Sequence, residues 1–382
     1  SGAGVGLTTV ALGLVHALDE RGIRVAFFKP IGQPVARDTS PERSTHFISS
    51  ITSLRPVTPI PLEEAEALLG ARRGDELLER VVRAFRASAG DADVVVVEGL
   101  IHTPDAPSEV ELNLQLMRAL SAEVIVVGAF RDGGFGEFVA RVTRTAQHYG
   151  ATARGRVIGC IANRVPNNGL TPRELYSALA RELGPRTRAE LTLIGAVAEN
   201  AELGAVRVVD VAQHLGALSL NEGELHARRV RRFTLLARTV PNLIDSLVPG
   251  SLLITPSDRC DVVLAVAMAA VKKVPLAGLI ITGEGELPRA VLELCSPALA
   301  TGLPLLGVPG TSWDTVAALM NLSNEVPPDD LERARLGMTH VAAHLDRDWL
   351  VQRARAPVEA RMSPAAFCFR LVDIVSRIGA RI

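Results

Sequence analysis

The chain opens with the stretch Ser1-Gly2-Ala3-Gly4-Val5-Gly6-Leu7-Thr8-Thr9, which has the spacing of a phosphate-binding loop without its lysine. The full pattern is G-x-x-x-x-G-K-[ST], in which backbone N–H groups surround the phosphates and the lysine reaches the β- and γ-phosphate oxygens. Gly6 and Thr8 stand at the last glycine and the hydroxyl position, whereas Leu7 stands at the lysine position. The stretch predicts a nucleotide-binding fold with weakened or lost hydrolysis, which favours ligand sensing over NTP chemistry.

Four apolar stretches after this loop have the character of buried strands. They lie at residues 23–28, 94–97, 124–128 and 157–162. Stretches with helical apolar spacing separate them, at residues 8–20, 61–88 with a break near Gly70, 110–120 and 137–149. Strands that alternate with helices form βαβ units, so we expect an α/β fold with a parallel sheet covered on both faces.

Three polar residues directly follow predicted strands, at the sheet edge where α/β proteins bind ligands. Lys29 could bind an anionic ligand or be solvated. Glu98 could coordinate Mg²⁺ or meet the N-terminus of an adjacent helix. Asn163 could read a base edge or cap the turn before Pro166. Thr8 most simply caps the first helix.

The predicted nucleotide or effector site combines the loop with these strand ends. It comprises Gly2, Gly4, Val5, Gly6, Leu7, Thr8, Thr9, Lys29, Glu98 and Asn163. We expect no metal site and no catalytic residue.

The composition limits the partners of the chain. A net charge of -1 over 382 residues offers no basic field for nucleic acid. Charged residues interrupt every apolar run before the roughly 18 residues that a membrane span needs. The four cysteines, Cys160, Cys260, Cys295 and Cys368, form no C-x-x-C pair, which predicts structural thiols in a reducing, cytoplasmic compartment.

A second α/β unit is predicted after residue 200. Its strands lie at 251–255 and 277–281. Asp258 and Arg259 follow the first strand, and Thr282 and Gly283 follow the second. These four residues could contact a ligand, or Asp258 and Arg259 could pair only with each other or with helix ends.

These motifs in this order resemble the N-terminal region of long-form bacterial phosphate acetyltransferases. They are G-L-T-T at 6–9, F-K-P-I-x-Q-P at 28–34, V-E-G-L at 97–100, Asn163, and the Asp-Arg and Thr-Gly turns of a DRTGG domain, from which Glu284 departs. The family's N-terminal region is similar in fold to dethiobiotin synthetase, a P-loop enzyme. The resemblance implies a degenerate P-loop domain at 1–200, a DRTGG regulatory domain at 201–325, and at 326–382 a helical linker to a catalytic domain.

The resemblance also implies a function. The family interconverts acetyl-CoA plus phosphate with acetyl phosphate plus CoA, and its N-terminal region tunes activity in response to metabolites and helps to assemble a homo-oligomer. A nucleotide, ATP or NADH, would act here as an effector. The partners would be small-molecule effectors and the chain's own catalytic domain. Since no strand precedes Ser1 and strand-like residues close the sequence, we expect a piece of a longer chain.

Two alternatives stay open. The chain could be a stand-alone ATP-dependent carboxylase or ligase like dethiobiotin synthetase, which would require Lys29 to replace the missing lysine. It could also be a purely structural oligomerisation module. His340 and His344 share a helix face without a third ligand, so we interpret them as surface or packing residues.

Overall fold

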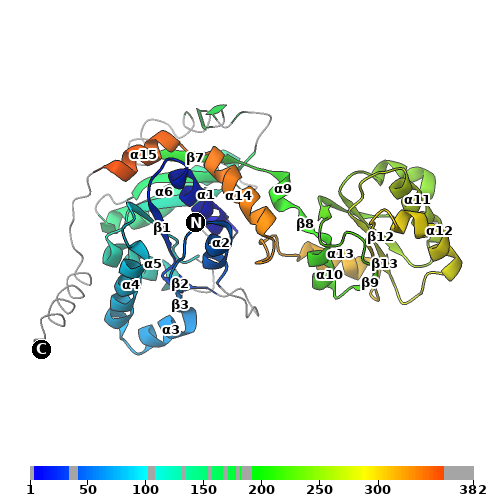
Figure 1. Ribbon diagram of the computed structural model, residues 1–382, viewed down its shortest axis with the longest axis horizontal. Helices are drawn as coiled ribbons and strands as arrows, with labels where there is room; N and C mark the ends of the chain where they lie inside the picture. Colours follow the sequence, from blue (N-terminus) through cyan, green and yellow to red (C-terminus); the bar gives the residue numbers. More distant parts are fainter. Residues whose placement is uncertain are drawn as a thin grey trace, which may run out of the picture. The chain divides into compact units, whose positions relative to one another are not determined.

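The structure is a computed structural model that describes residues 4–33, 42–101, 108–130, 134–153, 157–166, 171, 173–174, 176–177, 181 and 192–356. It separates into two compact units (Figure 1). The first unit comprises Ser1–Glu199 and Pro327–Ile382, and the second comprises Asn200–Val326. Among the described residues, no helix combines the length and the apolar character that a membrane crossing requires.

The first unit is an α/β body with parallel sheets, as the alternating pattern predicts. Its strands are β1 (Val25–Phe28), β2 (Ile31–Gly32), β3 (Ile60–Pro61), β4 (Val94–Val97), β5 (Val124–Ala129), β6 (Val157–Val165) and β7 (Leu193–Ala198). Strand β1 pairs with β4, β2 pairs with β3, and β6 lies between β5 and β7, all in parallel. The predicted α/β fold class is thus confirmed.

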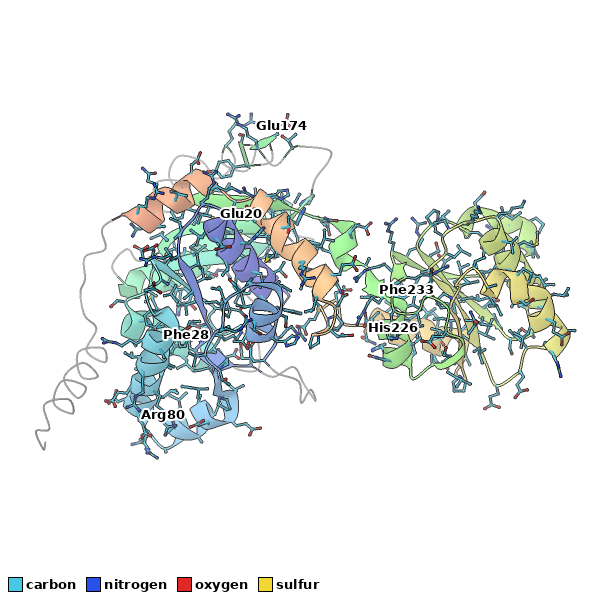
Figure 2. All side chains as sticks on the ribbon, viewed as in Figure 1. Glu20, Phe28, Arg80, Glu174, His226 and Phe233 are labelled. Atoms are coloured by element: carbon cyan, nitrogen blue, oxygen red, sulfur yellow. The ribbon has the colours of Figure 1, made fainter. Side chains whose placement is uncertain are left out.

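Helices cover these strands. They are α1 (Leu7–Asp19), α2 (Arg43–Ile51), α3 (Leu62–Gly70), α4 (Gly74–Ala89), α5 (Ser108–Leu120), α6 (Gly134–Ala153), α14 (Leu331–Ala343) and α15 (Arg347–Arg355). Helix α4 packs on β1, α6 packs on β5 and β6, and α1 packs on β1 and β4. Phe28, labelled in Figure 2, is fully buried among the apolar residues beneath α4.

The described residues 327–356 group with the first unit, in the region for which the sequence predicted a helical linker to a catalytic domain. Helix α14 lies along α1 (Figure 1), and Gly13 allows this approach because a Cβ at that position would clash with Val341. The ring of His340 hydrogen-bonds to the carbonyl of Ala198 at 2.8 Å. Burial lowers the pKa of His344, which fits its packing role. Apolar and polar contacts together therefore hold α14 in place.

The second unit has one five-stranded sheet in the order β11-β12-β13-β14-β9. The first four strands are parallel and the last is antiparallel to its neighbour. They are β11 (Arg232–Leu235), β12 (Ser251–Pro256), β13 (Gly278–Thr282), β14 (Leu305–Val308) and β9 (Leu218–Asn221). A separate pair joins β8 (Val206–Arg207) to β10 (Arg229–Val230) in antiparallel fashion.

Four helices of the second unit cover the two faces of this sheet. They are α10 (Val208–Leu215), α11 (Cys260–Val271), α12 (Arg289–Leu299) and α13 (Ser312–Met320). The short helix α9 (Ala201–Gly204) buries none of its residues, and 3₁₀ turns lie at Val240–Asn242 and Ile244–Ser246. One apolar cluster lies under α11 and α12, and another lies under α10 and α13. Because β12 and β13 are parallel neighbours, their carboxyl ends meet at one edge of the sheet. The Asp-Arg and Thr-Gly turns follow at this edge.

Candidate functional site

The loop before α1 contains two glycines with left-handed backbone conformation. Gly4 and Gly6 both have φ of 77°, in the left-handed region that favours glycine. Gly6 is the N-cap of α1 and accepts a hydrogen bond from the N–H of Val10 at 3.0 Å. The prediction that Thr8 caps this helix is wrong, because Thr8 lies inside the first turn and its hydroxyl contacts other elements.

Five side chains meet beside this turn and form what we call the Glu98 cluster: Thr8, Lys29, Glu42, Ser44 and Glu98. The Oε1 atom of Glu98 accepts hydrogen bonds from Lys29 Nζ at 2.7 Å, Ser44 Oγ at 2.8 Å and Thr8 Oγ1 at 3.1 Å. Lys29 Nζ also lies 3.6 Å from a carboxylate oxygen of Glu42. The cluster thus joins the starts of α1 and α2 to the ends of β1 and β4.

The charged side chains of Lys29 and Glu98 in the Glu98 cluster are buried, so their charges interact strongly with each other. The side chain of Glu98 is 0% exposed and that of Lys29 is 3% exposed, so Lys29 is not solvated. Burial by itself would lower the pKa of Lys29, but the carboxylates of Glu98 and Glu42 outweigh it, and the pKa lies above its ordinary value. With two carboxylates and one ammonium, the cluster is formally negative. It places a cation next to the loop without leaving that cation free for a phosphate.

The raised pKa of Lys29 predicts an alkaline limit to the stability of the cluster. A group whose pKa is higher in the folded state stabilises the fold below its unfolded pKa, about 10.4 for lysine, and loses that contribution as pH rises through the folded value. We expect the stability difference between the wild type and Lys29→Met to be constant from pH 6 to 9 and to shrink above about pH 10.4. Urea unfolding at pH 7, 9 and 11 measures it. A difference that shrinks already between pH 7 and 9 would contradict this assignment.

Asn163 fixes the loop from β6. Its Nδ2 atom donates to the carbonyl of Val5 at 2.8 Å, and its Oδ1 atom accepts from the N–H of Arg164 at 2.9 Å. A Cβ at Gly6 would lie 2.6 Å from the same Nδ2. The amide therefore positions the loop and also supports its own local turn.

Gly6→Ala is expected to destabilise the protein by about 2 kcal/mol or more, because it combines the left-handed backbone penalty of about 1–2 kcal/mol with the Asn163 contact. Gly22→Ala is the matched control, since Gly22 has φ of 72° and open space around its Cβ position. Thermal and urea unfolding of both variants measure the difference. Equal losses in the two variants would show that Asn163 does not press on the loop.

Sequence reasoning missed Glu42 and Ser44, which complete the cluster. Glu42 caps α2 by accepting from the N–H groups of Ser44 at 3.2 Å and Thr45 at 2.8 Å. A carboxylate just before a helix was a signal for the cap. Nothing in the pattern connected this cap with Lys29.

Gln33 and Asn113 were also missed as supports of the chain after β4. Gln33 accepts from the N–H of Ile101 at 2.7 Å. Asn113 binds both backbone groups of Leu100, at 2.8 and 2.9 Å. These amides satisfy backbone that leaves the sheet directly after Glu98.

The second unit brings Thr282 and Gly283 together but holds Arg259 in a different network. Thr282 is buried and its Oγ1 lies 2.6 Å from Ser312 Oγ. Gly283 has φ of 97°, and its N–H donates to the carbonyls of Val308 and Gly310. Arg259 donates to both carboxylate oxygens of Asp261, at 2.9 and 3.0 Å. This pair ties Arg259 to the first turn of α11, one of the two alternatives left open.

Asp258 and Glu284 are exposed beside these turns. Among the described residues, no group of three His, Cys, Asp or Glu side chains is arranged to hold a metal ion. Burial raises the pKa of Cys160 to about 12, so this thiol stays protonated and unreactive at neutral pH. Gly2 and Cys368 lie outside the described residues.

Comparison with known families agrees with this geometry. A family model described as an AAA domain matches residues 1–207, more than half of the chain. The chain belongs to this AAA domain family. A second model, described as a DRTGG domain, matches residues 210–322, which covers the five-stranded sheet of the second unit.

Curated relatives match this chain along nearly its whole length. Phosphate acetyltransferase of Pseudomonas putida is 41% identical over 380 residues, which is 99% of this chain and 54% of that protein. The enzymes of Pseudomonas aeruginosa and Escherichia coli are 39% and 32% identical, and each covers 100% of this chain. The chain spans about half the length of the curated relatives it matches.

Solved structures give weaker similarities. A Cyanothece McdA(D38A)–ATP complex has a TM-score of 0.33 at 16% identity and covers 53% of this chain and 81% of that one. The MinD cell division protein of Aquifex aeolicus has a TM-score of 0.30 at 14% identity, covering 53% and 80%. The CBS and DRTGG regulatory region of a Clostridium perfringens pyrophosphatase has a TM-score of 0.25 at 15% identity, covering 38% and 52%.

Proposed function

We propose that this chain is the regulatory and oligomerisation region of a phosphate acetyltransferase and has no catalytic activity by itself. The observation that carries the proposal is the similarity to these enzymes along nearly the whole chain, with an AAA domain followed by a DRTGG domain. The parent enzyme would interconvert acetyl-CoA plus phosphate with acetyl phosphate plus CoA. Its partners would be metabolites, its own catalytic domain and further copies of itself in the cytoplasm.

The loop supports binding without turnover. Leu7 stands where a phosphate-binding loop has its lysine, and a hydrogen bond to a charged group contributes about 1.5–3 kcal/mol. Lys29 does not supply this charge freely, because it is buried between Glu98 and Glu42. An effector such as ATP or NADH would then be held by the backbone of residues 4–9 and by Thr8 and Thr9. The ligase alternative requires a mobile or exposed Lys29, which the cluster disfavours.

The turns after β12 and β13 are the second proposed effector site. Gly283 presents left-handed backbone next to the Thr282–Ser312 hydroxyl pair, and Asp258 is exposed beside them. A metabolite that binds one quaternary state more tightly than another would shift activity by the difference between the two affinities.

The assay of the natural polypeptide tests this proposal. We expect acetyl phosphate formation whose rate changes with ATP, NADH, pyruvate or phosphoenolpyruvate, and a truncated enzyme without residues 1–382 that no longer responds. A natural polypeptide without acetyltransferase activity would overturn the proposal. An unchanged response after truncation would favour the purely structural alternative.

Restoring the missing charge is a sharper test of the loop. Leu7→Lys is expected to raise the affinity for ATP at least tenfold, as the energy of one charge-assisted hydrogen bond implies. Leu7→Met is the matched control, because it changes shape but adds no charge. Calorimetric titration with ATP compares the three proteins. Equal affinities for Leu7→Lys and Leu7→Met would show that the loop does not contact phosphate.

A further inference from the structure

One edge of the sheet in the second unit is unpaired and exposes apolar side chains. The structure describes every residue of this unit, and none of the described strands pairs with the outer edge of β11. Phe233 (Figure 2) and Leu235 of β11 are 40% and 43% exposed. An unprotected edge of this kind is a template for pairing with another chain.

The backbone of β11 carries hydrogen-bonding groups at this edge. The N–H of Leu236 donates to the carbonyl of Ile254 at 2.9 Å, toward β12. Successive residues of a strand direct their N–H and C=O groups to opposite sides. The groups of Leu235, and of Phe233 two positions earlier, therefore point away from β12. Among the described residues, these outward groups have no backbone partner.

The exposed side chains of β11 lie on the same face of the sheet as α13. Phe233 stands in register with Leu252 of β12, and Leu235 stands in register with Ile254. Both β12 residues are buried in the apolar cluster under α10 and α13. Helix α13 contacts β12, which is the neighbour of β11. This face of β11 is thus left open beside α13.

Helix α13 adds two larger apolar side chains. Trp313 and Met320 are 75% and 82% exposed and lie two turns apart on one side of the helix. Together with Phe233 and Leu235 they form what we call the β11–α13 surface. Since a large side chain buries about 150–250 Å², the exposed parts of these four provide roughly 1,000 Å² in two copies. Specific interfaces bury about 1,200–2,000 Å², so the strand backbone and flanking residues need to supply only the remainder.

We propose that β11 pairs in antiparallel fashion with β11 of a second copy of this chain, across a two-fold axis at Thr234. Phe233 of each copy then stands opposite Leu235 of the partner subunit. The outward N–H and C=O groups of these residues exchange four hydrogen bonds. The pairing joins the two five-stranded sheets and brings the two β11–α13 surfaces together. This inference rests on the oligomerisation role proposed above.

The charges at the ends of β11 favour this occupant and this register. Between Arg232 and Arg238 the strand carries no charge, so two copies can lie side by side without repulsion. With the axis at Thr234, Arg232 faces Leu236 of the partner subunit. With the axis one residue later, Arg232 would face Arg238 of the partner subunit, and like charges directly opposite each other destabilise a sheet.

The other edge of the sheet is less suited to pairing. Strand β9 also exposes two leucines, Leu218 and Leu220. Its register with β14 shifts between Leu305 and Leu306, however, and irregularities of this kind protect sheet edges. The two leucines of β9 therefore provide a control for those of β11.

Sedimentation equilibrium of the whole chain tests the proposal. We expect self-association whose dissociation constant rises at least tenfold in Leu235→Lys, because lysine at an edge opposes pairing. Leu220→Lys is the matched control, since Leu220 is 45% exposed at the opposite edge, and we expect a change below twofold. If Leu235→Lys weakens association no more than Leu220→Lys, the β11 pairing is overturned but the oligomerisation role is not. A monomer at every concentration overturns both.

Oxidative cross-linking covers the case in which the lysine variant does not fold. At the axis, the two copies of Thr234 form a pair that is not hydrogen-bonded, with Cα atoms about 4.5 Å apart. This separation suits a disulfide. We expect Thr234→Cys to give a covalent dimer on a non-reducing gel, and Ser219→Cys, which is exposed on β9, to remain a monomer. No dimer from Thr234→Cys, or equal dimer from both variants, would overturn the proposal.

Discussion

Lys29→Met is expected to lower the free energy of unfolding by about 3–5 kcal/mol, the usual cost of leaving a buried charge without its partner. Glu98 has a fully buried side chain, and its Oε2 atom has no hydrogen-bond partner among the described residues. Without Lys29, that carboxylate retains only the hydroxyls of Thr8 and Ser44. We expect the loss of stability to affect the start of α1, because Thr8 in its first turn binds Glu98, and with it the loop that precedes α1.

Urea unfolding measures this loss, with Lys272→Met as the matched control. Lys272 is exposed at the end of α11, so its replacement is expected to change stability by less than about 0.5 kcal/mol. The double variant Lys29→Met/Glu98→Leu removes both charges and is expected to recover part of the loss. A loss below about 1 kcal/mol in the single variant would show that the ion pair does not hold the cluster together.

Gly13→Leu is expected to destabilise the first unit by about 3 kcal/mol, the upper range for overpacking a core. A Cβ at this position clashes with the Cβ and Cγ1 atoms of Val341 and lies 3.3 Å from the N atom of Ala342. Helix α14 would have to move away from α1. The variant therefore tests whether the chain after residue 326 is an integral part of the first unit.

Gly136→Leu is the matched control, because Gly136 also lies inside a helix but has open space around its Cβ position. Leucine is a better helix former than glycine by several tenths of a kcal/mol, so this variant is expected to be neutral or stabilising. Thermal unfolding and limited proteolysis between residues 326 and 331 report the two effects. Similar stability changes in both glycine variants would place α14 away from α1.

The α/β fold class could be predicted from the sequence because it depends on local patterns of apolar residues. The four valines at 94–97 predict a buried strand, and the helical spacing of apolar residues between the strands predicts the covering helices. Neither prediction requires knowledge of the tertiary structure. The packing position of residues 331–343 could not be predicted in this way. Their helical pattern was visible, but the absent side chain at Gly13 decides where the helix packs, and that contact joins residues over 300 positions apart.

The candidate site was only half predictable for the same reason. Lys29 and Glu98 follow strands, and Asn163, which the sequence placed after a strand, lies near the end of β6. Parallel strands bring their carboxyl ends together. The sequence could not show that Lys29 and Glu98 bind each other, or that Glu42 joins them from the start of α2. The role of Thr8 was mistaken because a hydroxyl near a helix start can cap it or face a neighbour, and only the position of Gly6 distinguishes the two.

Calorimetric titration of this chain with ATP, NADH, pyruvate and phosphoenolpyruvate, with ATP hydrolysis followed in the same samples, tests the regulatory function most directly. We predict saturable binding of at least one metabolite and no hydrolysis. Silence toward all four would contradict a sensing role and leave a structural module. Hydrolysis of ATP would contradict the proposal that the chain has no catalytic activity, because the chain would then act as an enzyme without the lysine of its loop.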